Sequence, residues 1–126
     1  MQIKSLDHLV LTVADIETTR QFYSNILGMQ VISFNQDRKT LRFSNQKINL
    51  HQKGHEYEPK AKYPTPVSAD LGLITDTPLD SVIEELKQNN ISIEQGPIAK
   101  HGALGDIESV YIRDPDQNLI EISNYK

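Results

Sequence analysis

Two histidines and two carboxylates occupy similar places in the two halves of this sequence. His8 and His51 lie in the first half, and Asp70 and Glu121 lie in the second. Imidazole nitrogen and carboxylate oxygen together suit divalent ions such as Zn²⁺, Ni²⁺, Mn²⁺, Co²⁺ and Fe²⁺. These residue types therefore predict one divalent metal ion per site, with an identity that the residues leave open.

An internal repeat relates the two pairs of residues. The stretch DHLVLTV resembles ADLGLIT, which matches His8 with Asp70. The stretch RFSNQKINLH resembles RDPDQNLIEI in pattern, and this comparison matches His51 with Glu121. Each half is marginal for independent folding, so we expect the halves to pair through their sheets, within one chain or between two.

The first half, module 1 at about 4–52, has the pattern of a strand, a helix and three strands. Alternating apolar residues predict strands at 6–13, 30–34, 39–43 and 47–52. Asp15 is a suitable N-cap for a helix whose apolar spacing continues to a C-terminal stop at Gly28. Turn residues at 35–37 and 44–45 separate the last three strands.

The second half, module 2 at about 69–125, follows a proline-containing linker at 53–68 and repeats this order. Thr77 is the expected N-cap of a helix with Pro78 at its first position, and a left-handed residue at 89–90 is expected to end it. The strands expected in this half are 70–75, 91–94, 108–113 and 118–124, and the last two are joined by a turn at 114–117. The segment 96–106 contains three glycines, which suggests a mobile cover over the site.

The alternation of side chains along a strand sorts the candidate ligands onto one face. If Leu11 and Leu50 face the helix of the first half, His8 and His51 lie on the opposite face of the sheet. The same rule places Asp70 and Glu121 on the helix-free face of the second half. A hydrogen-bonded structural role is an open alternative for each residue, and Glu121 is also able to pair with Arg42 or Arg113.

Five further residues are candidates for contact with a substrate. Two arginines precede the ligand-bearing strands and are suited to an anionic group, although a salt bridge at the sheet rim explains them as well. Tyr111 is expected by alternation to project from the helix-free face, with a packing role as the alternative, and Lys100 and His101 lie in the glycine-containing segment 96–106. The five candidates are Arg42, Tyr111, Arg113, Lys100 and His101.

The composition excludes several other classes of site. The 126 residues include no cysteine, which rules out disulfides, thiolate metal sites and a cysteine nucleophile. The net charge of −4 argues against a nucleic-acid surface. No apolar run approaches the length of a membrane span and no secretion signal is evident at the N-terminus, so we expect one cytoplasmic domain over 1–126 with no membrane partner.

The stretches LDHLVLTV, ILGM and YIRDPDQNLIEI, together with the strand that ends in His51, resemble the vicinal oxygen chelate superfamily. This superfamily includes glyoxalase I, extradiol dioxygenases, fosfomycin resistance enzymes and bleomycin-binding proteins. LRFSNQKINLH and PTPVSADLGLIT are most similar to the branch called glyoxalase domain-containing protein 5. The resemblance implies an α+β fold in which two βαβββ modules pair into a curved mixed sheet around a metal cup, with the helices on the outer face, and a homodimer that binds a small molecule.

By position, the resemblance carries the four metal-ligand sites of the family onto His8, His51, Asp70 and Glu121. Bacterial glyoxalase I has Glu at the second site and His at the third, so the ligand types are exchanged here. The resemblance implies an isomerase or lyase of glyoxalase I type, with Glu121 or Asp70 moving a proton. If Asp70 does not bind the metal, the remaining two-His, one-carboxylate set suits an iron dioxygenase. A third alternative is a protein that sequesters an antibiotic without catalysis.

Overall fold

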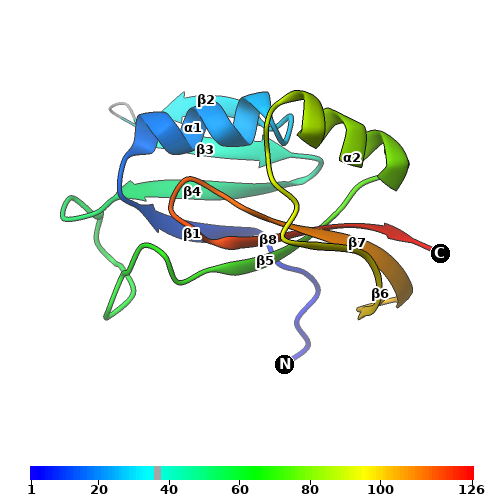
Figure 1. The fold of residues 1–126 in the computed structure, drawn as a ribbon. Helices are drawn as coiled ribbons and strands as arrows, with labels where there is room; N and C mark the ends of the chain where they lie inside the picture. The colour runs from blue at the N-terminus through cyan, green and yellow to red at the C-terminus, as the bar shows by residue number, and fades with distance from the viewer. Residues whose placement is uncertain (36–37) are drawn as a thin grey trace. The chain divides into compact units, whose positions relative to one another are not determined.

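We describe a computed structural model of the protein, in which residues 1–35 and 38–126 are described. The chain divides into two compact units, Met1–Ser68 and Ala69–Lys126 (Figure 1). The predicted linker at 53–68 therefore belongs to the first unit. Each unit is a four-stranded sheet with one helix, and the two are described separately below.

The first unit has the predicted order of one strand, one helix and three strands. Its sheet has the strand order β1-β4-β3-β2, in which β1 runs parallel to β4 and the other neighbours are antiparallel. Helix α1 packs against β2, β3 and β4 (Figure 1). The elements are β1 (His8–Val13), α1 (Ile16–Asn25), β2 (Gln30–Phe34), β3 (Arg38–Phe43) and β4 (Gln46–Gln52).

Local sequence explains where the elements of the first unit begin and end. The carboxylate of Asp15 caps α1, and its Oδ2 atom accepts a hydrogen bond of 3.0 Å from the backbone N–H of Thr18. Gly28 has a φ of 69° after the helix, as the predicted stop requires. The turn before β4 has Ser44 at a φ of 51°, whereas Gln36 and Asp37 of the predicted 35–37 turn lie outside the described residues.

The second unit has the same topology, with the strand order β5-β8-β7-β6 and a parallel β5–β8 pair. This repeat confirms the prediction of two βαβββ modules. In both units the helix-facing side chains of the strands form the core, for example Leu41 and Leu50 in the first and Ile112 and Ile120 in the second. The elements are β5 (Asp70–Ile74), α2 (Leu79–Gln88), β6 (Gln95–Gly102), β7 (Gly105–Arg113) and β8 (Leu119–Tyr125).

The predicted cap at Thr77 is wrong. Pro78 occupies the N-cap position of α2 and makes no side-chain capping hydrogen bond. The amide oxygen of Asn124 on β8 instead accepts a hydrogen bond of 2.8 Å from the backbone N–H of Leu79. A distant side chain therefore satisfies a donor that a local cap was expected to satisfy. The other end agrees with the prediction, since Asn90 has a φ of 57°.

The predicted strand at 91–94 is also wrong, and most of the segment 96–106, for which a mobile cover is predicted, lies in strands. Residues 95–102 form β6, which pairs with β7 along most of its length. Gly96 has a φ of 112°, and a Cβ atom there would lie 2.4 Å from the carbonyl oxygen of Ser109. Glycine at position 96 therefore permits a close approach to the backbone of β7.

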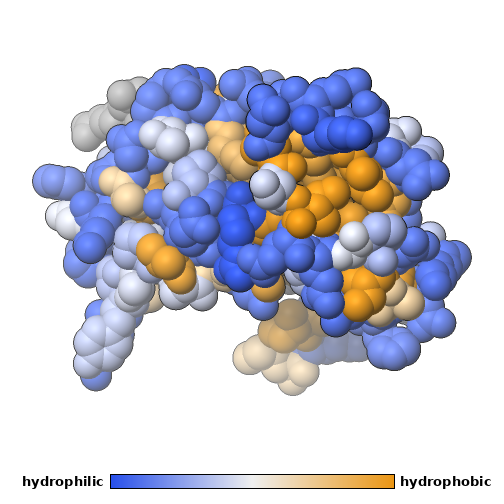
Figure 2. Space-filling model, viewed as in Figure 1, coloured by the Kyte–Doolittle hydropathy of each residue, from blue (hydrophilic) through white to orange (hydrophobic). Residues whose placement is uncertain are grey.

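The outward surfaces of α1 and α2 are mainly hydrophilic (Figure 2). This is the surface expected when each helix buries one apolar side against its own sheet. In the described part of the chain, no helix has the length and apolar character needed to cross a membrane.

The turn between β7 and β8 is held by a buried carboxylate. Asp114 Oδ1 accepts hydrogen bonds of 2.9 Å from the backbone N–H groups of Asp116 and Asn118, and Oδ2 accepts one of 2.8 Å from the amide of Asn118. The Asp114 side chain thus satisfies donors that have no access to water.

We predict that Asp114→Ala lowers the free energy of unfolding by about 2–3 kcal/mol, because it leaves buried donors without an acceptor. Urea denaturation followed by circular dichroism measures this difference. Asp76→Ala is the matched control, since Asp76 is exposed and its loss of charge is the same. Equal stability of the two variants would contradict the role assigned to Asp114.

Candidate functional site

The helix-free face of the first unit carries both predicted histidine ligands. Ile48 and Leu50 of β4 are buried toward α1, whereas Asn49 and His51 alternate with them and are half-buried on the other face. His8 begins β1 on this same face, beside Lys47 of β4. The predicted alternation is therefore present in this unit.

The helix-free face of the second unit carries both predicted carboxylate ligands. Asp70 begins β5 and is exposed, and Glu121 lies in the middle of β8 and is half-buried. Ile120 and Ile122 on either side of Glu121 are buried toward the opposite face. His8 and Asp70 thus hold the same position in their respective modules, the first residue of the strand that runs parallel to its neighbour.

The strand registers correct the sequence match between His51 and Glu121. In the first unit, Val10 is paired with Asn49, two residues after His8 on β1. In the second unit, Gly72 is paired with Glu121, and Gly72 lies two residues after Asp70 on β5. The module equivalent of Glu121 is therefore Asn49, and His51 lies two residues farther along its strand, on the same face.

His8 is oriented by its sequence neighbour. Its Nδ1 atom lies 2.8 Å from Oδ2 of Asp7, and this hydrogen bond lowers the pKa of the Asp7 carboxyl. An ionised carboxylate on Nδ1 favours the ring form in which Nε2 is left as the basic nitrogen. Metal-binding histidines are commonly oriented in this way.

Asn49 has an unusual environment for an amide. Its Oδ1 atom is buried and, among the residues described, has no hydrogen-bond partner. An unpaired buried carbonyl oxygen is energetically unfavourable and is a common mark of a site that receives a ligand, an ion or a water molecule. Asn49 therefore belongs with the candidate residues on the helix-free face.

His51 contacts the segment that follows β4. The Tyr57 ring packs edge-on against the His51 ring at a centroid distance of 5.4 Å, and the Arg38 guanidinium lies 3.6 Å from the centre of the Tyr57 ring. Partial burial, with a smaller effect from Arg38, lowers the pKa of His51. A neutral imidazole is thereby favoured, which is the form able to bind a metal.

Glu121 is oriented by Ser109, which in turn contacts Ser123 on the same face. Its Oε1 atom accepts a hydrogen bond of 2.6 Å from Ser109 Oγ, which lies 2.7 Å from Ser123 Oγ. Gly72 lies opposite Glu121 on β5, and a Cβ atom there would be 3.7 Å from Oε2. One carboxylate oxygen is therefore held by the protein, and the other borders a residue without a side chain.

Tyr111 lies beside Glu121 in the β7–β8 register. Burial, followed by a hydrogen bond to Glu121, raises the pKa of the Tyr111 hydroxyl. The ammonium group of Lys100 lies 5.7 Å from the centre of the Tyr111 ring. Two of the predicted substrate residues of the second unit therefore share a face with Glu121.

The other two predicted substrate residues of this unit have different surroundings. Arg113 makes a two-pronged ion pair with Glu94, with N–O distances of 2.9 and 3.0 Å. His101 alternates with Lys100 and lies on the opposite face of β6, where its Nδ1 atom is 3.1 Å from Asp106. The structure therefore assigns Arg113 a salt bridge and separates His101 from Glu121.

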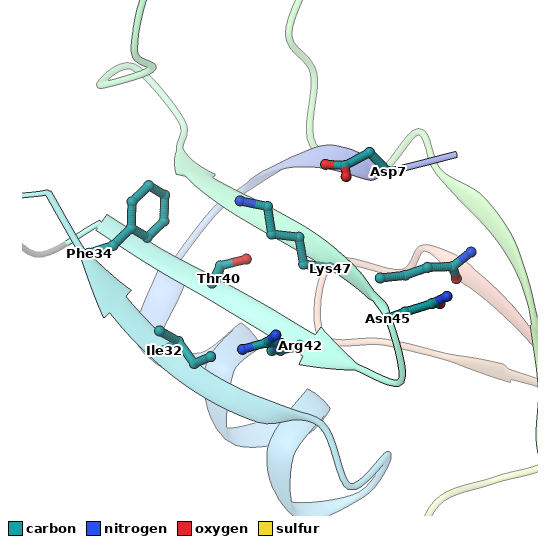
Figure 3. A pocket seen from close by; sticks show the side chains of 8 residues that line it. Asp7, Ile32, Phe34, Thr40, Arg42, Asn45 and Lys47 are labelled. Atoms are coloured by element: carbon teal, nitrogen blue, oxygen red, sulfur yellow. The ribbon is translucent and has the colours of Figure 1, made fainter. Parts of the chain in front are cut away.

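Arg42 lines a pocket on the helix-free face of the first unit. Side chains from β2, β3 and β4 rise from the same side of the sheet around a cavity of about 440 Å³ (Figure 3). The lining residues are Asp7, Ile32, Phe34, Thr40, Arg42, Asn45, Gln46 and Lys47.

Each unit contributes two of the four predicted metal ligands. Over 1–35 and 38–126, no three His, Asp or Glu side chains form a ready-made metal-binding group. The residues beside the candidate ligands that the sequence did not indicate are Asp7, Asn49, Tyr57 and Ser109. Asp7 precedes His8 directly, so a search for carboxylates beside candidate histidines would have found it, whereas the other three depend on strand register or loop packing.

We predict that Arg38→Gln raises the pKa of His51 in metal-free protein, because the nearby positive charge is removed. The pKa stays below its ordinary value, since burial is the larger cause and is unchanged. Titration of the His51 ring by NMR measures the shift. Arg20→Gln on the surface of α1 is the control, and an equal response of His51 to both variants would refute this account.

Sequence comparison identifies similar proteins along nearly the whole chain. Residues 5–122 match the Glyoxalase/Bleomycin resistance protein/Dioxygenase superfamily. The chain is 58% identical to Virulence protein STM3117 of Salmonella typhimurium, over 99% of this chain and 87% of that protein. It is 48% identical to Glyoxalase domain-containing protein RDO1 of Mycosarcoma maydis, over 100% of this chain and 71% of that protein.

Solved structures agree with this grouping. The crystal structure of Virulence protein STM3117 has a TM-score of 0.98 at 57% identity and covers 100% of both chains. An integron cassette protein from the mobile metagenome of V. cholerae has a TM-score of 0.98 at 52% identity, over 100% of this chain and 98% of that one. The narrower likeness to glyoxalase domain-containing protein 5 stays a prediction. The chain belongs to the Glyoxalase/Bleomycin resistance protein/Dioxygenase superfamily.

Proposed function

We propose that this protein is a metal-dependent enzyme of glyoxalase I type, in which His8, His51, Asp70 and Glu121 bind one divalent ion. The observation that carries the proposal is the contact of 2.8 Å between His8 Nδ1 and the Asp7 carboxylate. This contact supports a ligand role for Nε2, because a carboxylate against Nδ1 favours the tautomer in which Nε2 is the basic nitrogen.

The donor set fits a divalent ion of the first transition row. Glu121 has one oxygen held by Ser109 and the second beside Gly72, which supports a role for Oε2 as a ligand. Burial lowers the pKa of His51, which favours the neutral imidazole that binds a metal. Because Asn49 Oδ1 is buried and has no partner among the described residues, the Asn49 amide is the alternative to His51 as a metal ligand.

When bound, such an ion supplies Lewis-acid stabilisation of the negative charge that develops on two adjacent substrate oxygens. The protein residues then have to move a proton. Glu121 or Asp70 takes a proton from one substrate carbon and returns it to the neighbouring carbon, and the hydroxyl proton passes from the first substrate oxygen to the second, so that the substrate is isomerised without an oxidant. Tyr111, with its raised pKa, stays protonated and donates toward Glu121.

A non-haem iron dioxygenase is the second candidate function. The specific feature in its favour is the subset of His8, His51 and Glu121, which is a two-His, one-carboxylate set. Consumption of O₂ with catechols after anaerobic loading with Fe²⁺, together with no isomerisation of 2-oxoaldehyde–thiol adducts, would favour it. A metal-free protein that still binds an antibiotic would favour sequestration without catalysis.

The proposal also includes a homodimer in which the modules pair through their sheets, within one chain or between two. Its exchanged form brings His8 and His51 of one chain to Asp70 and Glu121 of the other. A monomer that binds stoichiometric metal would contradict that exchange, and light scattering of the metal-loaded protein distinguishes the two forms.

We predict that replacing both His8 and Glu121 by Ala abolishes stoichiometric binding of divalent metal, because one nitrogen and one carboxylate donor are lost. Elemental analysis of purified protein and titration with Zn²⁺, Ni²⁺, Mn²⁺, Co²⁺ and Fe²⁺ measure the loss. His55→Ala with Glu84→Ala is the matched control, since both residues are exposed. Full retention of metal by the His8 and Glu121 double variant would refute the proposed ligand set.

A pair of single variants tests whether His51 or Asn49 is the second metal ligand of the first module. We predict that His51→Ala weakens metal binding more than Asn49→Ala, because a neutral imidazole is a better donor to these ions than an amide oxygen. Calorimetric titration of the two variants gives the comparison. The opposite order would make Asn49 the ligand in place of His51, in agreement with the register match between Asn49 and Glu121.

A further inference from the structure

The two modules differ at one matched pair of positions in a way that changes their charge. Arg42 is paired with Lys47 across β3 and β4, and Arg113 is paired with Leu119 across β7 and β8. The first module therefore has two cations where the second has one cation and one apolar residue.

The arginines at these matched positions also differ in their partners. Arg113 is neutralised by its two-pronged contact with Glu94. For Arg42, the described residues offer no ion pair, and its neighbour on β2 is the uncharged Gln30. A salt bridge at the sheet rim thus explains Arg113, whereas over 1–35 and 38–126 no carboxylate is paired with the Arg42 guanidinium.

The two cations of the first module line one pocket. Its cavity of about 440 Å³ has room for a small organic molecule. Asp7 is the single acidic side chain among the lining residues, and it is already hydrogen-bonded to His8. The pocket therefore has an excess of positive charge that an anion would balance.

The same pocket has an apolar side. Ile32 and Phe34 of β2 lie beside the cations on the helix-free face and are half-buried (Figure 3). The ammonium group of Lys47 lies 5.3 Å from the centre of the Phe34 ring. A molecule whose oxyanion contacts the cations would thus have its flat apolar part against Ile32 and Phe34.

We propose that this pocket binds a small organic oxyanion, with its carboxylate or phosphate group against Arg42 and Lys47 and its flat apolar part against Ile32 and Phe34. Arginine binds both kinds of oxyanion through paired N–H donors, and lysine adds a point charge.

The pocket adjoins the residues assigned to the metal. Lys47 is the register partner of His8, and Asp7 both lines the pocket and orients His8. Identifying the bound anion as the substrate class rests on the proposed function, whereas binding of the anion itself does not require a metal.

The test uses four probes and NMR-detected titration of the full chain after treatment with a chelator. Benzoate and phenyl phosphate are expected to bind and to shift backbone signals at 32–34 and 40–47. Benzamide, which has the ring without the charge, is expected to bind at least about tenfold more weakly. Inorganic phosphate, which has the charge without the ring, is expected to bind more weakly than phenyl phosphate. The ratio of benzoate to phenyl phosphate affinity identifies which oxyanion the pocket prefers.

Variants assign the binding to the proposed residues. Arg42→Gln and Lys47→Met are each expected to weaken benzoate binding by about tenfold or more, because a charge-assisted contact is lost. Arg20→Gln removes the same charge from the surface of α1 and is expected to leave binding unchanged. Phe34→Ala is expected to remove the advantage of phenyl phosphate over inorganic phosphate.

The outcomes separate this inference from the metal proposal. Benzoate binding that is unaffected by Arg42→Gln and Lys47→Met would refute the proposed anion site. Benzoate binding that occurs only in metal-loaded protein and is lost in His8→Ala would also refute it. Absence of binding by all four probes would also overturn it. Oxyanion binding that depends on Arg42, in a protein that binds no metal, would support the pocket and refute the metal site.

Discussion

The alternation of side chains along a strand is the constraint on which this molecule depends. Each sheet has a helix on one face only, so every second strand residue enters a dry core and the residues between are left for another purpose. Ile48 and Leu50 in one module, and Ile120 and Ile122 in the other, are buried by this rule. Asn49 and Glu121 are on the opposite faces for the same reason, on strands whose positions are fixed by the core. Chemistry and packing are thus assigned to alternate residues of the same strands.

Orientation of the polar side chains is a second level of organisation. Asp7 holds His8, Ser109 holds one oxygen of Glu121, and Tyr57 packs on His51. Each contact restricts a side chain that would otherwise sample several rotamers, which reduces the entropy lost when a ligand binds. Polar side chains on a helix-free face usually hydrogen-bond to water. The contacts of these three side chains with protein groups instead restrict their rotamers.

The two modules have one topology and different surfaces. Both modules bury aliphatic side chains on the strand faces that pack against their helices. The paired residues on their helix-free faces differ in charge. Arg113 is neutralised by Glu94, but Arg42 has the uncharged Gln30 as its neighbour and Lys47 on its other side. Duplication of a one-sided sheet permits this divergence, because substitutions on the helix-free face leave the core and therefore the fold intact. The modules are thus free to differ on this face without a change of fold.

Local patterns in the sequence determined most of the elements, the Asp15 cap, the left-handed residues after both helices and the face on which each candidate ligand lies. These features depend on residues within a few positions of one another. Tertiary structure decided the rest. Asn124 replaces Thr77 as the partner of the α2 N-terminus across 45 residues, and Gly96 allows a close approach to β7 at the irregularity in the β6–β7 register. The equivalence of Asn49 with Glu121 follows from pairing between distant strands, and a shift of two residues keeps the same face, so alternation alone has no means to detect it.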